Sequence, residues 1–274
     1  MKKNIFVLTS LMLTLGCGCD SFLDETNYSD VTSEGGYYDT EAGLNAVVNA
    51  CYTPLRFWAG KEDAIGLSET GTDIIAAGSG CVDNNMAAYT QSLDGTNSAC
   101  TFYFDRFYAA INWCNTAIFH AQTVPNPSND EILATTLNKR EAEARVLRTF
   151  YYWILTETFG DTYYTDQPST SIVMNPVKTS TDNIYQYMFD DLDWAIKSKL
   201  STLQNDGGRV TIWTAKALKA RLLLTRASEK NDVDMYGQAY DLAKDVIENG
   251  PFELAEDFAS IWDMKNSDGN SNKE

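Results

Sequence analysis

The sequence predicts an all-α protein, built from stacked antiparallel helix pairs with long loop insertions. Its amphipathic segments follow one another through short connections, which is typical of helices that pack against their sequence neighbours. No run of alternating polar and apolar residues is long enough to require a substantial sheet. A composition of 44% hydrophobic and 12% aromatic residues, with only 6 prolines, indicates one ordered globular body with ample material for a core.

Residues 1–18 have the pattern of a cleaved secretory signal. Lys2 and Lys3 precede an apolar run over residues 5–15, which is followed by small residues and cysteines. This run is too short for a lasting helix across a bilayer, which needs about 20 apolar residues. We therefore expect residues 1–18 to be removed and residues 19–274 to form the mature helical domain.

Two cysteines directly after the apolar run, Cys17 and Cys19, are candidates for lipid attachment. A thiol in this position suits acylation, and the acyl chains would then hold the protein on a membrane. The alternative is an ordinary cleavage site with incidental cysteines. Neither Thr14 nor Gly16 is the aliphatic residue usually favoured three positions upstream, so the spacing alone leaves the choice of cysteine open.

The first helix is expected over residues 41–58, with Asp39 or Thr40 as its N-cap. Its apolar face comprises Leu44, Val47, Val48, Cys51 and Leu55. Gly60 should end the helix. Residues 60–100 are rich in Gly, Ser, Thr, Asp and Asn, which favour turns, so they predict a long loop-rich insertion.

Two long helices should follow, the first over residues 103–122 and the second from residue 128 or 129 to residue 159. In the first, recurring three- and four-residue steps join Phe104, Phe107, Tyr108, Ile111, Cys114, Asn115, Ile118 and Phe119. Pro125 and Pro127 should stop it. The second carries one stripe, with two residues beside it: Leu147, Tyr151, Ile154 and Thr158, then Phe150 and Leu155. Gly160 is placed to end this helix.

Residues 161–178 should be extended and irregular, after which Thr179 and Asp182 offer a capping-box-like helix start. This helix should run to about residue 199 and bury Ile184, Met188, Leu192 and Ala195.

The last two helices are expected over residues 211–228 and 235–249, the second ended by Gly250 and Pro251. A stripe of mostly small residues in the first should permit close helix contact: Ala217, Ala220, Leu224 and Ala227. The pair has the dimensions of a tetratricopeptide-type hairpin, although the chain shows no strict internal repeat. We therefore predict helix stacking of the tetratricopeptide-like type.

The charge of the chain argues against nucleic acid as a partner. Without residues 1–18 the formal net charge falls from −17 to −19, because that segment carries two lysines and no acid. Such a surface repels phosphate backbones and disfavours direct adsorption to anionic lipid, but it is compatible with a neutral ligand such as a sugar.

The remaining cysteines are too widely spaced for a CxxC-type metal site, and we predict neither metal nor cofactor. In an exported protein, Cys81 and Cys100 are candidates for a disulfide between loop segments. Cys51 and Cys114 lie within helical patterns and are expected to be buried.

No catalytic constellation stands out. His120 has no metal-ligand or triad spacing around it, so a surface or partly packed histidine is the favoured interpretation. Nucleophile-elbow, zinc-protease, P-loop and dinucleotide-binding motifs are all missing. The 38 acidic residues supply many nominal carboxyl pairs, so no single pair indicates glycosidase chemistry. Arg145 and Arg148 should pair with helix carboxylates such as Glu141, which lies four residues before Arg145.

Several segments resemble, in order, the SusD/RagB family of outer-membrane nutrient-binding lipoproteins. Residues 19–24 (Cys-Asp-Ser-Phe-Leu-Asp) are similar to the family's lipid-bearing cysteine with its Phe-Leu-acid start, which favours Cys19 over Cys17. Further similar stretches are residues 69–73, 107–115, 184–196 and 208–224. The most specific one is Glu-Ala-Arg-Val-Leu-Arg-Thr at 143–149, followed by Phe-Gly-Asp at 159–161. Thr149 and Tyr163-Tyr164 depart from the family pattern, which leaves the local loop geometry open.

The resemblance implies a surface-exposed, lipid-anchored protein of the outer membrane that binds a glycan and passes it to a SusC-like TonB-dependent transporter. It implies binding and release, and therefore no enzyme. A peptide-binding RagB-like import protein and a surface glycoside hydrolase are the alternatives. Family members continue into a large C-terminal portion, so we expect this chain to be truncated and part of the ligand site to be absent.

A ligand site is expected in the loop over residues 78–102, because family members use loops from this part of the chain for ligand. Aromatic rings can stack on the apolar face of a sugar, while Asn and Asp bind its hydroxyls. The hypothesis is that Tyr89 stacks on the sugar while Asp83, Asn84 and Asn85 bind hydroxyls. A plain surface loop is the competing interpretation.

Overall fold

The computed structural model describes residues 36–59, 62–78, 84–126, 128–198, 200–202 and 208–263. Its helices belong to one compact unit that begins at Tyr38. In chain order they are α3 (Glu41–Tyr52), α4 (Leu55–Ala59), α5 (Glu62–Ser68), α6 (Asn84–Ala88), α7 (Ser98–Thr123), α8 (Glu131–Phe159), α9 (Thr181–Lys197), α10 (Ile212–Lys230), α11 (Val233–Asn249) and α12 (Phe258–Ile261). The predicted all-α class is confirmed. In the described residues, β structure is limited to one isolated antiparallel bridge between Thr162 and Thr179.

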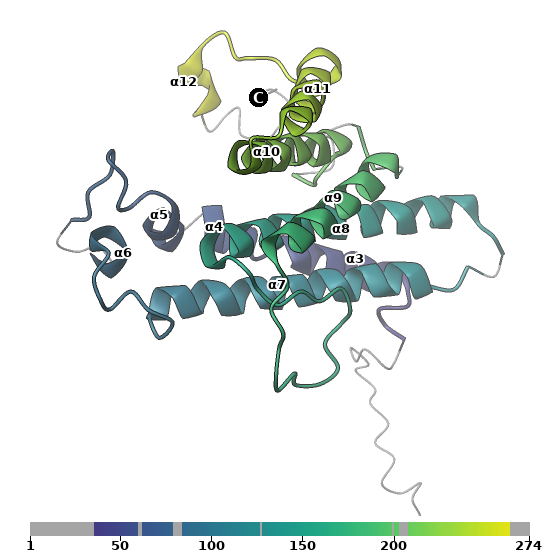
Figure 1. Ribbon diagram of the computed structural model, residues 1–274. Coiled ribbons are helices and arrows are strands. Elements are labelled where there is room, and N and C mark those ends of the chain that lie inside the picture. Colours follow the sequence, from purple (N-terminus) through teal and green to yellow (C-terminus); the bar gives the residue numbers. More distant parts are fainter. Residues whose placement is uncertain are drawn as a thin grey trace, which may run out of the picture. The chain divides into compact units, whose positions relative to one another are not determined.

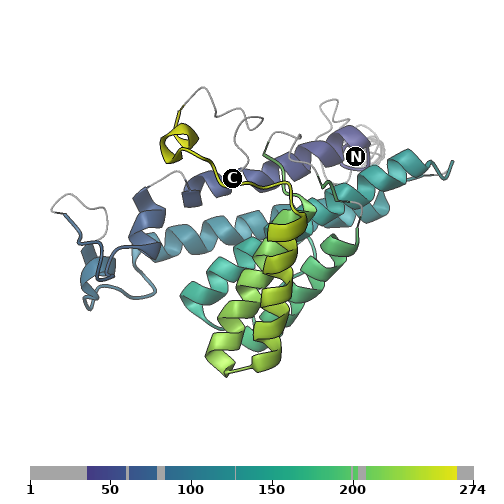
Figure 2. The ribbon, with the colours of Figure 1, turned by 90° about the horizontal axis from the view of Figure 1, so that it is seen from above.

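Helices α7 and α8 form a long antiparallel pair, and α3 packs against both of them. Helix α9 packs on α8, and α10 pairs with α11 and also packs on α9 (Figure 1). Seen from above, α10 and α11 lie side by side as an antiparallel hairpin (Figure 2). From α7 to α11 each helix therefore packs mainly against its neighbours in the sequence, as the tetratricopeptide-like prediction requires, whereas α3 packs on the more distant α7 and α8.

The core lies where α3, α7, α8 and α9 meet. Its largest fully buried side chains are Tyr103, Tyr151, Tyr152, Tyr185, Phe107, Leu44, Ile111, Leu147, Leu155, Ile184, Met188 and Leu192. Cys51 and Cys114 are buried as predicted, and the Tyr151 hydroxyl donates to the Cys51 carbonyl at 2.6 Å. Buried tyrosines of this kind add large apolar area while each keeps a polar end to be satisfied.

The predicted helix over residues 41–58 is wrong at its centre, because the chain divides into α3 and α4. Pro54 has no backbone N–H, and the Thr53 N–H turns back to Ala50 O at 3.1 Å to close α3. Thr40 is the N-cap, its hydroxyl accepting from Gly43 N at 3.1 Å. Asp39, the other candidate cap, pairs instead with His120 at 2.7 Å, and this histidine is buried.

The predicted loop over residues 60–100 is only partly a loop. It contains the short helices α5 and α6, and α7 already begins at Ser98, because Asn97 caps it by accepting from Ala99 N at 2.9 Å.

Helix α8 begins at Glu131, one residue after its cap Asp130. Gly160 ends it in a left-handed conformation at φ 69° that a glycine adopts without penalty, as expected.

Two further predictions need correction. Helix α9 is capped by Ser180 and not by Thr179, because Thr179 N donates to Thr162 O at 2.8 Å in the β-bridge. In α10 the stripe is misplaced: Ala220 and Ala227 are buried, but Leu224 is 53% exposed and Leu223 is buried in its place. The four predicted buried residues of α9 all lie in the core.

Candidate functional site

The two arginines of the most specific sequence stretch lie on α8 and hold α9 in place. Arg145 binds Glu141 one turn earlier, with Nη2 2.6 Å from Oε1, and it reaches Asp191 on α9 at 2.5 Å. Arg148 is buried and donates to the same Asp191 carboxylate from Nε and Nη2, both at 2.8 Å. Both arginines therefore pair with carboxylates, as predicted.

Helices α7 and α8 also fix the segment between α8 and α9, over residues 161–180. Asn115 of α7 donates from Nδ2 to the carbonyls of Thr165 and Gln167, each at 3.1 Å. The Tyr152 hydroxyl of α8 donates to Thr165 O at 2.9 Å and accepts from Thr165 N at 2.8 Å. This segment is irregular, as predicted, and its base is held by side chains of both long helices.

The aspartate of the Phe-Gly-Asp turn clamps the start of the next helix. Asp161 Oδ1 accepts from Thr181 N at 2.8 Å and from the Thr181 hydroxyl at 3.0 Å. These hydrogen bonds hold the pKa of the Asp161 carboxyl below its ordinary value, because they favour the ionised form.

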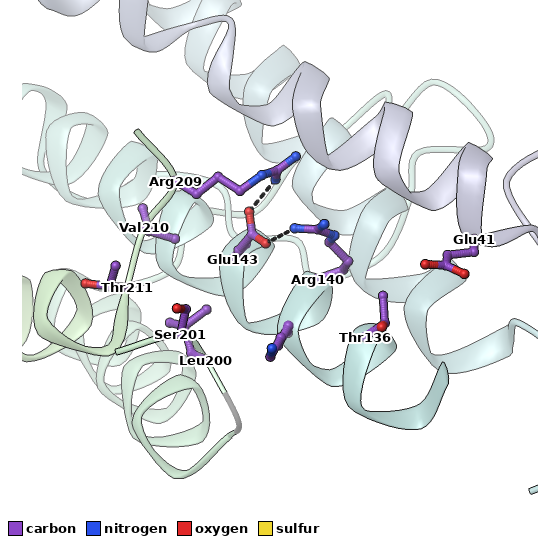
Figure 3. Close-up of a pocket in the computed structure, with 10 residues that line it drawn as sticks. Glu41, Thr136, Arg140, Glu143, Leu200, Ser201, Arg209, Val210 and Thr211 are labelled. Carbon is purple, nitrogen blue, oxygen red and sulfur yellow. Dashed lines mark hydrogen bonds and ion pairs between the residues drawn. The ribbon is translucent and has the colours of Figure 1, made fainter. Parts of the chain in front are cut away.

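A polar pocket of about 200 Å³ lies between the first half of α8, the start of α3 and residues that connect α9 to α10 (Figure 3). Its lining consists of Glu41, Thr136, Lys139, Arg140, Glu143, Leu200, Ser201, Arg209, Val210 and Thr211. Figure 3 shows the Glu143 carboxylate between the Arg140 and Arg209 guanidinium groups. Arg209 Nη1 lies 2.6 Å from Glu143 Oε2, and Arg140 Nη1 binds the other oxygen.

The Glu143 ion pairs also connect three separate segments. The Tyr52 hydroxyl at the end of α3 donates to Glu143 Oε2 at 2.7 Å and accepts from Val210 N at 3.1 Å. Burial and the neighbouring Glu143 charge raise the pKa of Tyr52 well above its ordinary value, so this donor stays protonated. Burial acts to lower the pKa of Arg209, but Glu143 outweighs it and the net shift is upward.

Two asparagines of α3 complete this network. Arg140 Nε donates to Asn45 Oδ1 at 2.5 Å, and Arg209 Nη2 donates to Asn49 Oδ1. In the sequence, Glu143 and Arg209 stand out only as members of two family-like stretches, and no role in a pocket was predicted for either. Nothing in their separation of 66 positions signals that the two side chains meet.

Three of the four residues predicted to bind ligand lie in α6 (Asn84–Ala88) or directly after it. Asp83 lies outside the described residues, and Asn84 is the first residue of α6. Asn85 Oδ1 accepts from the Thr90 hydroxyl at 2.7 Å, across the turn that follows the helix. Tyr89 lies in that turn with its side chain 72% exposed. The structure thus brings Asn85 and Tyr89 into one short helix-turn unit.

The Tyr89 ring lies beside Gly71 and is largely exposed. Its φ of 48° is in the left-handed region, which is uncommon for a residue with a side chain. The ring lies close to Gly71, where an added Cβ would come within 3.0 Å of Tyr89 Cε2. Gly71 itself has φ 86°, so a glycine suits both its conformation and the close approach of the ring.

The predicted lipid attachment and the predicted disulfide both involve cysteines that the structure does not describe. Cys19 and Cys81 both lie outside the described residues, so lipid attachment and the Cys81–Cys100 disulfide stay predictions. Within the described ranges, no helix combines the length and apolarity needed to span a bilayer. In the same ranges, no cluster of three or more His, Cys, Asp or Glu side chains is placed to hold a metal ion.

The fold is that of the SusD superfamily. A SusD homolog from Bacteroides thetaiotaomicron matches with a TM-score of 0.73 and 21% identity, over 89% of this chain and 47% of that one. A crystal structure with xylogluco-oligosaccharide matches with a TM-score of 0.67 and 24% identity, over 85% and 45%. A laminarin-binding SusD-like protein matches with a TM-score of 0.64 and 20% identity, over 83% and 49%.

Residues 72–273 match the SusD-like family described as starch-binding and associating with the outer membrane, and the chain belongs to this family. A SusD-like protein from Bacteroides ovatus is 26% identical over 100% of this chain and 49% of its own length. The SusD-like protein P2 from Formosa agariphila is 26% identical over 98% and 51%. The chain therefore spans about half the length of the curated relatives it matches.

Proposed function

We propose that the chain is the N-terminal helical part of an outer-membrane surface lipoprotein that binds a glycan and delivers it to a SusC-like TonB-dependent transporter. The observation that carries this proposal is the family match over residues 72–273, since that family is described as starch-binding and associated with the outer membrane. The function requires affinity with release, so the protein acts without catalysis.

Glycan as the ligand class is supported by two structural neighbours. One was crystallised with xylogluco-oligosaccharide, and the other is described as laminarin-binding. The strongly acidic composition agrees with a neutral or weakly charged ligand and disfavours nucleic acid.

The glycan-binding loop of this proposal is the α6 region. Tyr89 presents an exposed ring beside Gly71, on which the apolar face of a sugar can lie. Asn85 lies one turn before it, and the proposal adds Asp83 and Asn84 as ligands of sugar hydroxyls.

The direct test is binding of the purified protein to panels of polysaccharides and peptides by isothermal titration calorimetry. Binding to one or more glycans and no peptide is the expected result. Binding to peptides alone would indicate a RagB-like peptide importer. Release of shortened product from a bound glycan, abolished by replacing one carboxylate, would indicate a glycoside hydrolase and overturn the proposal.

The membrane anchor of this proposal is a lipid on Cys19. Metabolic labelling with an alkyne fatty acid should label the wild-type protein and the Cys17→Ala variant, and should fail to label Cys19→Ala. Both substitutions replace a cysteine with alanine, and the two positions are only two residues apart. Each variant is therefore the control for the other. Labelling that is lost in Cys17→Ala and kept in Cys19→Ala would assign the lipid to the other cysteine.

Delivery to a transporter predicts a complex in the outer membrane. Detergent extraction of the tagged protein from its own cells should co-purify a large β-barrel protein of the SusC-like class. Extraction of the tagged protein alone, under conditions that keep other membrane complexes intact, would argue against this partner.

A further inference from the structure

The pocket beside Glu143 concentrates positive charge in a chain whose formal net charge is −17. Three cationic side chains, Lys139, Arg140 and Arg209, face two carboxylates, Glu41 and Glu143, so its lining carries a net charge of +1. The Glu143 carboxylate is shared between the two arginines, whose other hydrogen bonds go to neutral asparagines. One positive charge of this partly exposed group is therefore left without a counter-ion.

The donors of the pocket are not all used. Arg140 Nη2 makes no hydrogen bond with the described residues, and the side chains of Arg140 and Arg209 are 20% and 23% exposed. Lys139 lines the same pocket, is half-buried and has no ion-pair or hydrogen-bond partner in the described part of the chain. Unused cationic donors that converge on one cavity are suited to an anion with planar, forked geometry, such as a carboxylate.

The rest of the lining is suited to a sugar ring. Glu41, Thr136 and Ser201 offer oxygen atoms for hydroxyl groups, and Leu200 and Val210 offer apolar surface. The pocket volume of about 200 Å³ lies below the roughly 300–1,000 Å³ of sites for drug-sized ligands, so it suits a single ring and not a chain.

We propose that this pocket binds a uronate unit, that is, a sugar ring bearing a carboxylate. Lys139 and the spare Nη2 group of Arg140 receive the carboxylate, while Glu41, Thr136 and Ser201 receive ring hydroxyls. The proposal rests on the proposed function, because it names the kind of sugar that a glycan-binding protein of this type holds at a site separate from the α6 loop.

The test uses the purified protein and two matched pairs of monosaccharides, galacturonate with galactose and glucuronate with glucose. Members of a pair differ only at C6, where the acid has a carboxylate. Titration followed by NMR should show binding of at least one uronate and of neither neutral sugar, with amide shifts at Thr136, Lys139 and Val210. Affinity should fall as NaCl is raised, because the interaction between exposed charges is screened.

The informative variant is Lys139→Gln, because Arg140 and Arg209 also brace Glu143 and their loss would disturb the fold. Lys139→Gln should weaken uronate binding about tenfold or more, as expected for a charge-assisted hydrogen bond. The matched control is Lys178→Gln, since Lys178 is exposed, is not part of the pocket and loses the same charge. It should leave affinity within about twofold, and thermal melting should show both variants folded.

Equal binding of galactose and galacturonate, no uronate binding, or equal effects of the two lysine variants would each overturn the uronate proposal. Sulfated galactose and an acidic dipeptide serve as further probes, and tighter binding of either one would assign the pocket to that anion instead. Failure here is separable from failure of the proposed function. A protein that binds a neutral polysaccharide but no uronate keeps the proposed function and loses only this pocket assignment.

Discussion

Arg148 and Asp191 form a two-pronged ion pair in the interior, with Arg148 Nε and Nη2 each 2.8 Å from a carboxylate oxygen of Asp191. The Arg148 side chain is 4% exposed and that of Asp191 7%. The pair joins α8 to α9, and Arg148 Nη1 also donates to Asn115 Oδ1 of α7 at 2.8 Å. Three helices are therefore held in register by one guanidinium group.

Replacing Arg148 with Met should destabilise the protein by about 3–5 kcal/mol, because it removes one partner of a buried pair and leaves Asp191 with Arg145 alone. The free energy of unfolding, measured in urea, tests this. The double variant Arg148→Met/Asp191→Leu should cost less than the two single changes together, because it leaves no uncompensated charge.

The matched control for this pair is the exposed ion pair between Lys244 and Glu248, one turn apart on α11 at 3.8 Å. Lys244→Met should change the free energy of unfolding by less than about 1 kcal/mol, since exposed pairs contribute little. An equal loss in Lys244→Met and Arg148→Met would show that burial of the Arg148 pair has no special role.

Asp161 is predicted to stabilise the protein in a pH-dependent way. Its native pKa lies below its ordinary value of about 3.9, so its contribution is fully present above that pH and is lost as pH falls through the native pKa. Asp161→Asn should lower Tm at pH 6, and the difference from wild type should shrink below about pH 4. Asp241→Asn, an exposed acid of α11, should show no such difference. A gap in Tm that is constant from pH 6 to pH 3 would contradict this role of the Asp161 charge.

The long helices could be predicted from the sequence because their signals are local. Repeats of three and four residues located α7 to α11 within a few residues of their ends, and the four-residue spacing of Glu141 and Arg145 predicted their ion pair. The short helices α5 and α6 were missed, because seven and five residues rich in polar and small types carry no helical period.

The rest depended on contacts between distant parts of the chain. Thr179 and Ser180 are equally able to cap α9, and the choice is made by the bridge from Thr179 to Thr162. The Glu143–Arg209 ion pair of the pocket joins residues 66 positions apart, so no local pattern indicates it. The α6 loop was proposed as a site from family resemblance and composition, and its geometry around Gly71 became visible only in three dimensions.

Leu223 and Leu224 test the corrected face of α10 with two identical side chains. Leu223 is 2% exposed and packs in the core, whereas Leu224 is 53% exposed. Leu223→Ala should cost about 2–5 kcal/mol, because it removes buried methyl groups and leaves a cavity. Leu224→Ala should stay within about 0.5 kcal/mol of wild type, as for most surface changes. Chemical denaturation of the two variants side by side measures both values, and a larger loss for Leu224→Ala would restore the originally predicted stripe.

Tyr89→Ala tests the α6 loop as the glycan-binding site. Stacking of aromatic rings contributes about 0.5–1.5 kcal/mol beyond area burial, so a sugar that lies on this ring should lose about threefold to tenfold in affinity. Stability should change little, since the side chain is 72% exposed. Tyr240→Ala is the matched control. Tyr240 is also exposed, at 64%, but it lies on α11 and not in the α6 loop. Calorimetric titration with the glycan that binds wild type should separate the two variants. The substitution removes the Tyr89 ring and leaves the backbone in place. Unchanged affinity in Tyr89→Ala would therefore show that the ring does not contact the sugar, and would contradict the α6 loop as the binding site.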